Sequence, residues 1–257
     1  MRDQYAGDVN DFLKFAFLLV LAGKDRTLGV AWYYNPGDDG RADGRHLEWR
    51  EESAWQGLDR ELHAGLSMLP ERSVAALEKM PIWPKDTLFH RDPVPTKLTR
   101  DAWVRQMVTA MESADLLFLD PDNGLGGASA KHATFSEIRL LQKQGRAIVF
   151  ITFPGRNMSH NALVIRLHDQ LKAETGAGSV ITLRSTVRVP CAEGSHSRVP
   201  RQCWFTVINP DPELIARAQS FAYALSSVPQ VRAKLDGVPY AGSRDSGTIS
   251  RQFQPFP

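Results

Sequence analysis

The sequence predicts an α/β fold in which helices cover both faces of a mostly parallel sheet. Segments of strand composition alternate with helical segments along most of the chain, as in parallel α/β folds. Two continuous apolar runs, 116–119 and 147–151, are typical of central strands buried on both faces. The connection between 179–187 and 202–209 has no helical pattern, so we expect these two strands to pair as an antiparallel edge.

Each expected element has its own local signal. Strands are expected where β-branched and aromatic residues concentrate between turn residues, which gives six or seven segments. These are 27–35, 46–49, 87–91, 116–120, 147–153, 179–187 and 202–209. Helices are expected at 11–23, 58–69, 72–80, 100–113, 135–144, 162–174 and 213–227.

Capping signals set some of the helix ends. Asp11 is the expected N-cap of the first helix, whose nearly uniform apolar surface predicts burial. Thr134 and Glu137 form a capping box, and Gly145 is expected to end the helix that the box begins.

We expect one α/β domain over 1–236 that includes an insertion-like helical and loop region at 36–86. A loop-like or partly disordered tail is expected at 237–257.

Composition excludes some classes of protein. Hydrophobic residues make up 42% and charged residues 23% of the chain, which is ordinary globular composition. The net charge of +2 does not by itself indicate a nucleic-acid partner. The apolar segment 12–23 is shorter than the roughly 20 residues of a membrane span. Asp3, Asp8 and Asp11 stand where a signal peptide is basic, so we expect a cytoplasmic protein with Cys191 and Cys203 reduced.

The strongest candidate site follows the apolar run at 116–119. Asp120 would end a central strand, and ligands of open α/β sheets bind beyond such carboxyl ends. Pro121 holds Asp120 in an extended conformation, so Asp122 falls on the same side. Asn123 and Gly124 supply a tight turn. Such a group of acceptors suits an amino group, ribose hydroxyls or a divalent cation, although Asx turns would explain Asp122 and Asn123 equally simply.

Two further groups are expected near this site. Lys14 lies in the apolar first helix, where burying an unpaired ammonium costs free energy. We therefore expect its amine to contact a ligand, to reach solvent, or to pair with an acid such as Asp8 or Asp11. The loop 35–40, with Asn35, Gly37 and Asp38, could surround a nucleotide or metal with backbone amides, although it lacks the Gly-x-Gly-x-x-Gly spacing.

Basic and hydroxyl side chains supply candidate substrate contacts. Thr152 and Arg156 follow the apolar run at 147–151, and Arg156 suits an anionic group. Arg198 and Arg201 belong to an arginine-rich segment that could bind phosphate or lie solvated. The histidines show no zinc-ligand spacing, so no zinc site is expected.

Two stretches together resemble a family of uncharacterised bacterial and phage proteins. They are Tyr5-x-Gly7-Asp8-x-x-Asp11-Phe12-x-Lys14 and Asp120-Pro121-Asp122-Asn123-Gly124-Leu125. This family implies no activity.

A more remote resemblance covers most of the chain at the level of the fold. Segment 6–18 is similar to the opening helix of ribosomal-RNA adenine-N6 methyltransferases, which carries Gly-Asn-x-x-Asp-x-x-Lys-His. Asp120-Pro121 matches the first half of their Asp/Asn-Pro-Pro-aromatic motif, which binds the target amino group. The resemblance implies a Rossmann-like, methyltransferase-like three-layer sandwich that uses S-adenosylmethionine on a nucleic-acid or nucleotide amino group. Two features depart from this resemblance: Asp122-Asn123 replaces the second half of the motif, and no glycine-rich cofactor loop is recognisable. A relative that no longer transfers methyl groups is therefore an alternative.

The same stretch is also similar to the haloacid-dehalogenase phosphatase motif. In that interpretation Asp120 is the nucleophile, Asp122 is the general acid and Mg²⁺ lies between them, with Thr152 as the second motif. Gly124 replaces the expected threonine. A metal-dependent nuclease is a variant of this alternative.

A third alternative is a non-catalytic nucleotide- or nucleic-acid-binding module that uses the arginine-rich segment.

Overall fold

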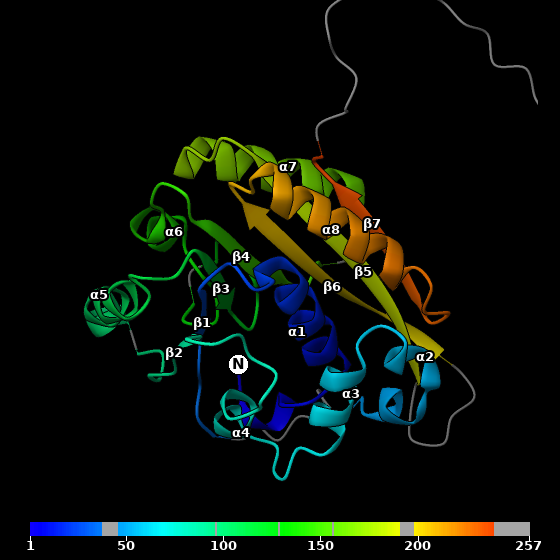
Figure 1. The fold of residues 1–257 in the computed structure, drawn as a ribbon. Helices are drawn as coiled ribbons and strands as arrows, with labels where there is room; N and C mark the ends of the chain where they lie inside the picture. Colours follow the sequence, from blue (N-terminus) through cyan, green and yellow to red (C-terminus); the bar gives the residue numbers. More distant parts are fainter. Residues whose placement is uncertain (38–45, 96, 128, 156, 191–197, 239–257) are drawn as a thin grey trace, which may run out of the picture.

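The computed structural model describes residues 1–37, 46–95, 97–127, 129–155, 157–190 and 198–238 (Figure 1). The α-helices are α1 (Val9–Ala22), α2 (Ser53–Gln56), α3 (Arg60–Ser67), α4 (Val74–Glu78), α5 (Arg100–Ala110), α6 (Phe135–Leu141), α7 (His160–Thr175) and α8 (Pro212–Leu225). The strands are β1 (Leu28–Trp32), β2 (Leu88–His90), β3 (Leu116–Asp120), β4 (Ala147–Thr152), β5 (Val180–Pro190), β6 (Arg198–Ile208) and β7 (Val231–Asp236). The described residues also form the short 3-10 helices η1 (Asp3–Tyr5), η2 (Glu48–Glu51) and η3 (Lys97–Thr99).

The described strands form one mixed sheet in the order β2-β1-β3-β4-β6-β5-β7. The first four strands are parallel. β6 is antiparallel to both β4 and β5, and β7 is antiparallel to β5. The expected α/β fold, with a parallel part followed by antiparallel strands, is therefore confirmed.

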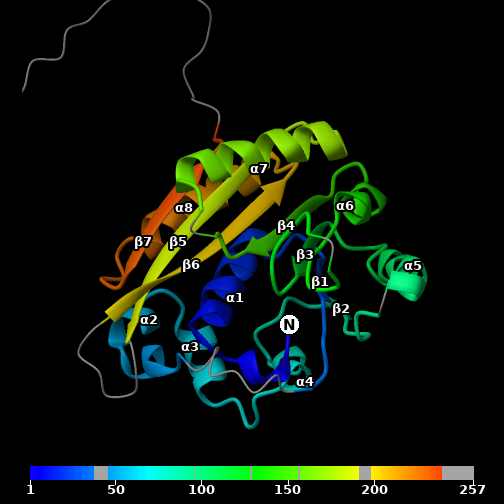
Figure 2. The ribbon, with the colours of Figure 1, turned by 180° about the vertical axis from the view of Figure 1, so that it is seen from behind.

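Helices cover both faces of this sheet, and each face has its own apolar core (Figures 1 and 2). On one face α1 and α8 pack on alternate strand residues such as Phe118 and Val149. On the other face α5, α6 and α7 pack on the intervening residues, such as Leu119 and Phe150. The strands 116–119 and 147–151 are buried on both faces, as their continuous apolar sequence predicts.

Several boundaries differ from the expectations. Asp8, not Asp11, is the N-cap of α1, because its carboxylate accepts the N–H groups of Asn10 and Asp11. The expected strand at 46–49 is wrong, since Glu48–Glu51 is a 3-10 helix. α6 ends at Leu141, before the turn that holds Gly145. The capping box of Thr134 and Glu137 is confirmed.

The antiparallel part is larger than expected. β5 and β6 pair as predicted, but β6 lies inside the sheet between β4 and β5. The outer edge is formed by β7, a strand that the sequence analysis missed. Most of the expected tail, 239–257, lies outside the described residues. Among the described residues, no helix combines the length and apolar composition that crossing a bilayer requires.

Candidate functional site

The carboxyl ends of β1 and β3 flank the point where the strand order reverses. β2 lies on one side of β1 and β3 on the other, so the chain crosses over β1 between them. In open α/β sheets such a topological switch point opens the crevice where ligands bind. The register pairs Trp32 with Asp120, so the segments after these two residues emerge side by side. The Asp120-Pro121-Asp122-Asn123 segment therefore begins at the switch point.

Asp120 is held in a buried ion-pair cluster with α1. Lys14 Nζ lies 3.0 Å from Asp120 Oδ1, 3.1 Å from Asp120 Oδ2 and 2.7 Å from Asp11 Oδ1. Lys14 is 3% exposed and Asp120 is 4% exposed. The Asp120 side chain thus points under α1 and not into an open crevice, which corrects the sequence-based expectation. Lys14 therefore has acidic partners, as its burial required. One of them is Asp11, which was expected from the sequence as a possible partner.

The cluster holds more carboxyl groups than cations. Burial alone would lower the pKa of Lys14, but Asp11 and Asp120 outweigh burial and raise it. Burial raises the pKa of Asp11 despite its contact with Lys14. Burial, followed by repulsion from Asp11, raises the pKa of Asp8 to about 7. Near neutral pH the buried charge of this cluster therefore depends on whether Asp8 holds a proton.

Asp122 belongs to a second group of acceptors at the switch point. Its Oδ1 lies 2.6 Å from the Met1 amine, which also donates to the carbonyl of Tyr33 at 2.8 Å and, at 3.5 Å, to that of Asp120. One carboxylate and two carbonyl oxygens thus converge on a single amino nitrogen. Asn123 is exposed and Pro121 is buried.

The structure gives no support to a metal ion at these carboxylates. Both Asp120 and Asp122 contact cationic nitrogens. In the part of the chain that the structure describes, no three or more His, Cys, Asp or Glu side chains gather as metal ligands would.

The loop predicted to bind a cofactor is described only as far as Gly37. Asn35 donates its N–H to the Met1 carbonyl at 2.9 Å, and the Gly37 carbonyl accepts from Arg2. These contacts place both residues beside the N-terminal segment, close to the switch point. Asp38, like the candidate Arg156, lies outside the described residues.

Thr152 ends β4, next to the site. Its hydroxyl is buried and has no hydrogen-bond partner among the described groups. A Cβ added to Gly124 would lie 2.8 Å from the Thr152 hydroxyl oxygen. The turn after β3 therefore lies directly against the end of β4, and Thr152 is close to the Asp120–Gly124 segment.

The two candidate arginines lie on β6, in the part that extends beyond the end of β4. Thr152 pairs with Trp204, and β6 starts six residues earlier, at Arg198. Arg198 is bound to Glu52 at 2.6 Å, whereas Arg201 is exposed. Arg198 is therefore neutralised by a partner and Arg201 remains open to solvent.

Cys203, on the same strand, is a buried thiol whose pKa is raised by burial, and Cys191 lies outside the described residues.

A polar network that no sequence pattern predicted lies on the opposite face of the sheet. Glu137 accepts from the Tyr33 hydroxyl at 2.9 Å and from Arg100 Nε at 2.7 Å, and Arg100 stacks over Tyr33 and Trp103. Burial, followed by Glu137, raises the pKa of Tyr33. The capping box located Glu137, but no sequence signal pairs it with Arg100, 37 residues earlier.

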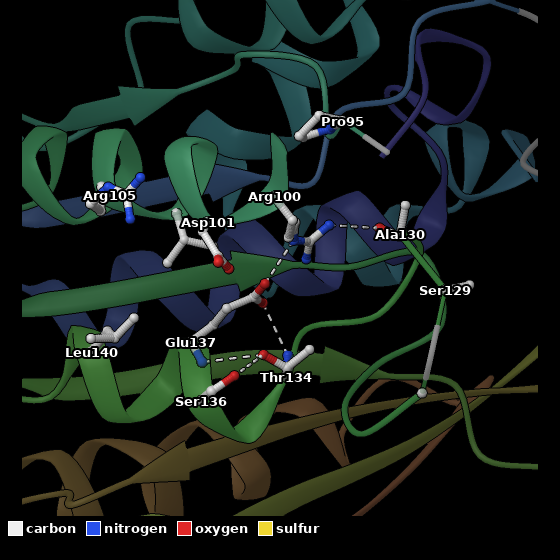
Figure 3. A pocket seen from close by; sticks show the side chains of 12 residues that line it. Pro95, Arg100, Asp101, Arg105, Ser129, Ala130, Thr134, Ser136, Glu137 and Leu140 are labelled. Carbon is white, nitrogen blue, oxygen red and sulfur yellow. Dashed lines mark hydrogen bonds and ion pairs between the residues drawn. The ribbon is translucent and has the colours of Figure 1, made fainter. Parts of the chain in front are cut away.

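A pocket of about 530 Å³ adjoins this network, between α5, α6 and the residues Gly127, Ser129 and Ala130 (Figure 3). Arg100 and Glu137 line it, but each is held by hydrogen bonds within the protein. Arg105 and Asp101 at its rim carry opposite charges. The lining thus shows no excess charge that would define a ligand.

Comparisons with known proteins give distant structural similarity alone. No protein-family model matches the chain, and no curated protein matches it. Among solved structures, the chain is similar to protein LPL1258 of Legionella pneumophila, which is assigned to family DUF519. The two share 12% identity over 91% of this chain and 99% of that one, with a TM-score of 0.46. A similarity of this size carries no argument about function.

Proposed function

We propose that the protein is a Rossmann-like, methyltransferase-like protein that binds S-adenosylmethionine and acts on an amino group of a nucleic acid or nucleotide. The observation that carries this proposal is the position of Asp120-Pro121-Asp122 at the β1/β3 switch point, where ligands of open α/β sheets bind. The antiparallel strands that follow four parallel strands also agree with the resemblance to class I methyltransferases.

The side chains and carbonyl groups around the switch point are hydrogen-bond acceptors, which suit a cofactor and a substrate that carry amino groups. Carboxylate and carbonyl oxygens accept hydrogen bonds from an ammonium or an exocyclic amine. In this reaction the methyl group comes from the bound cofactor.

The geometry divides the roles of the two carboxylates. Asp122 is partly accessible, so we assign it as the acceptor for the target amine, which would displace the Met1 amine from its Oδ1. Asp120 acts as a positioning residue, because Lys14 fixes its carboxylate and its carbonyl faces the same nitrogen. This assignment replaces the expectation that Asp120 itself receives the amine.

Calorimetric titration with S-adenosylmethionine, and separately with Mg²⁺, tests the proposal. We expect micromolar cofactor binding, about −8 kcal/mol, in the wild type and in Asp122→Asn. We also expect Asp122→Asn to lose methyl transfer to nucleic-acid or nucleotide acceptors. Asp25→Asn, at an exposed site, is the matched control and should retain both.

Two results would contradict the proposal. Absence of cofactor binding by the wild type removes its basis. Binding of Mg²⁺ alone, abolished by Asp122→Asn, would replace it with metal-dependent phosphoryl chemistry. Asp120→Asn is informative only with a thermal melt, because that change also disturbs the pair with Lys14.

A further inference from the structure

β5 and β6 form an antiparallel ribbon that extends past the carboxyl end of β4. Thr152 ends β4 and pairs with Trp204 of β6. Beyond this pair, β5 and β6 stay paired as far as Pro190 and Arg198, and we call this part (184–190 and 198–204) the ribbon. The six residues from Trp204 back to Arg198 span about 20 Å. Because Gly124 lies against Thr152, the ribbon starts beside the switch point.

The two faces of the ribbon differ in burial. Odd-numbered residues, such as Val187 and Cys203, belong to the apolar core on the α1 side of the sheet. Even-numbered residues point to the other side, on which Thr182 near the start of β5 contacts His168 of α7. Figure 2 shows β5 and β6 continuing beyond α7, and no described helix covers this side of the ribbon there.

Cations gather on this uncovered side. They are Arg184 and Arg188 of β5 and, on the paired strand β7, Arg232 and Lys234. Arg188, Arg232 and Lys234 are exposed. Asp236 is the one carboxylate among the described residues of these three strands, and it binds Arg184 at 2.6 Å and Lys234 at 3.0 Å. Positive charge therefore exceeds negative charge on this surface.

The chemistry of the surface fits a polyanion. Thr186 and Gln202, hydrogen-bonded at 2.9 Å, lie among the cations. The large apolar side chains that are exposed in the described part of the chain lie outside β5, β6 and β7. A helix that inserts into a lipid surface, and the centre of a protein interface, both present such side chains. Arginine, lysine, threonine and glutamine are side chains that contact the phosphates and sugars of nucleic acids.

We propose that this surface of β5, β6 and β7 binds the phosphate backbone of a nucleic acid whose modified base lies at the switch point. The inference rests on the proposed function and specifies its substrate as a nucleic acid, because a chain of phosphates can contact cations spread along the ribbon and a free nucleotide cannot. Phosphate contacts position a strand without reading its sequence. The ribbon therefore sets the path of the strand and leaves the choice of base to the switch point.

The salt dependence of binding tests the inference. Fluorescence anisotropy of a fluorescein-labelled single-stranded RNA measures the dissociation constant at several NaCl concentrations. Each phosphate of a single strand that a cation neutralises adds about 0.7 to the slope of log Kd against log salt concentration. We expect the variant Arg188→Gln/Arg232→Gln/Lys234→Gln to lose about 2 from this slope. If the two curves meet at about 1 M salt, that loss equals roughly 100-fold weaker binding at 0.1 M.

The matched control removes three exposed cations outside these strands, in the variant Lys24→Gln/Lys85→Gln/Arg105→Gln. Both triple variants lose the same net charge, so a difference in slope between them reports the position of the cations. We expect the control to keep the wild-type slope. Circular dichroism checks that both variants are folded.

Equal slopes for the two triple variants would overturn the inference, as would a wild type that does not bind the RNA. A polyglutamate peptide that displaces the RNA at equal charge concentration would also overturn it, since the surface would then take acidic protein segments. Titration of the same samples with S-adenosylmethionine separates this failure from failure of the proposed function. Cofactor binding with equal slopes rejects the ribbon surface alone, and absent cofactor binding rejects the proposed function.

Discussion

Lys14 of α1 and Asp120 of β3 are joined through both carboxylate oxygens, at 3.0 and 3.1 Å, although 106 residues separate them. The pair fixes the first helix against the end of a central strand. Asp11 holds the same ammonium at 2.7 Å, so the cation has two buried acidic partners. The end of β3 is therefore positioned by a residue near the start of the chain.

Replacing Lys14 tests how much stability this pair provides. Lys14→Met leaves Asp11 and Asp120 buried without their cation, and we expect it to lower the free energy of unfolding by about 3–5 kcal/mol. Urea unfolding followed by circular dichroism measures the change. Lys24→Met, at an exposed lysine, should stay within about 0.5 kcal/mol. Equal stability of the two variants would show that the pair contributes little to folding.

Stability should fall as pH rises towards and through neutrality. Burial and then Asp11 raise the pKa of Asp8 from 3.8 to about 7, so the folded protein binds a proton that the unfolded chain has released. This contribution is complete below the unfolded pKa and is lost as pH rises through about 7. For one proton the slope approaches about 1.4 kcal/mol per pH unit.

Asp8→Asn should flatten that part of the stability curve, because asparagine still caps a helix but does not titrate. Urea unfolding across the interval measures the slope. Asp25→Asn, which removes an exposed carboxylate, should leave it unchanged. If Asp8→Asn leaves the slope of the unfolding free energy against pH unchanged, the proton is bound by another group. Asp11 is the first such group to test.

The network on the other face makes a separate prediction. Glu137→Gln weakens the contacts with Arg100 and Tyr33, and we expect a loss of about 1–3 kcal/mol in the free energy of unfolding. Glu174→Gln breaks only the exposed 3.9 Å pair with Arg139 and should cost no more than about 0.5 kcal/mol. Thermal melts of both variants give the comparison, and similar values would mean that burial adds nothing to the Glu137 contacts.

Gly124 should tolerate no side chain. Its φ is +84°, and an added Cβ would lie 2.8 Å from the Thr152 hydroxyl oxygen. Gly145 has a similar φ, +79°, with open space around it, so Gly145→Ala measures the backbone cost alone, about 1–2 kcal/mol. We expect Gly124→Ala to cost about 1–3 kcal/mol more than that in chemical unfolding.

The double variant Gly124→Ala with Thr152→Ala isolates the steric part of this cost. Thr152→Ala removes the atoms that the new methyl group meets, so the double variant should recover the additional loss. Failure to recover it would place the strain elsewhere in the turn.

Local sequence signals located most elements but not all of their partners. The apolar runs of β3 and β4 and the capping box at Thr134 needed only neighbouring residues for their prediction. The strand β7 was missed even though Val231, Ala233 and Leu235 alternate with charged residues, because this short edge strand follows a helix without a strong turn signal. Asp11 was mistaken for the cap because both aspartates precede apolar residues, whereas its carboxylate is held inward by Lys14 and by the N–H of Gly7.

By itself the sequence determined the α/β class, the burial of the first helix and the Asp120–Gly124 segment at a strand end, because hydrophobic period and turn chemistry act over a few residues. Only the tertiary structure decided that Lys14 neutralises Asp120 and that Asp122 faces the Met1 amine. These relationships depend on strand order and register, which bring together residues far apart in the chain. Local pattern does not encode such pairings, since any buried cation could have met any of several nearby carboxylates.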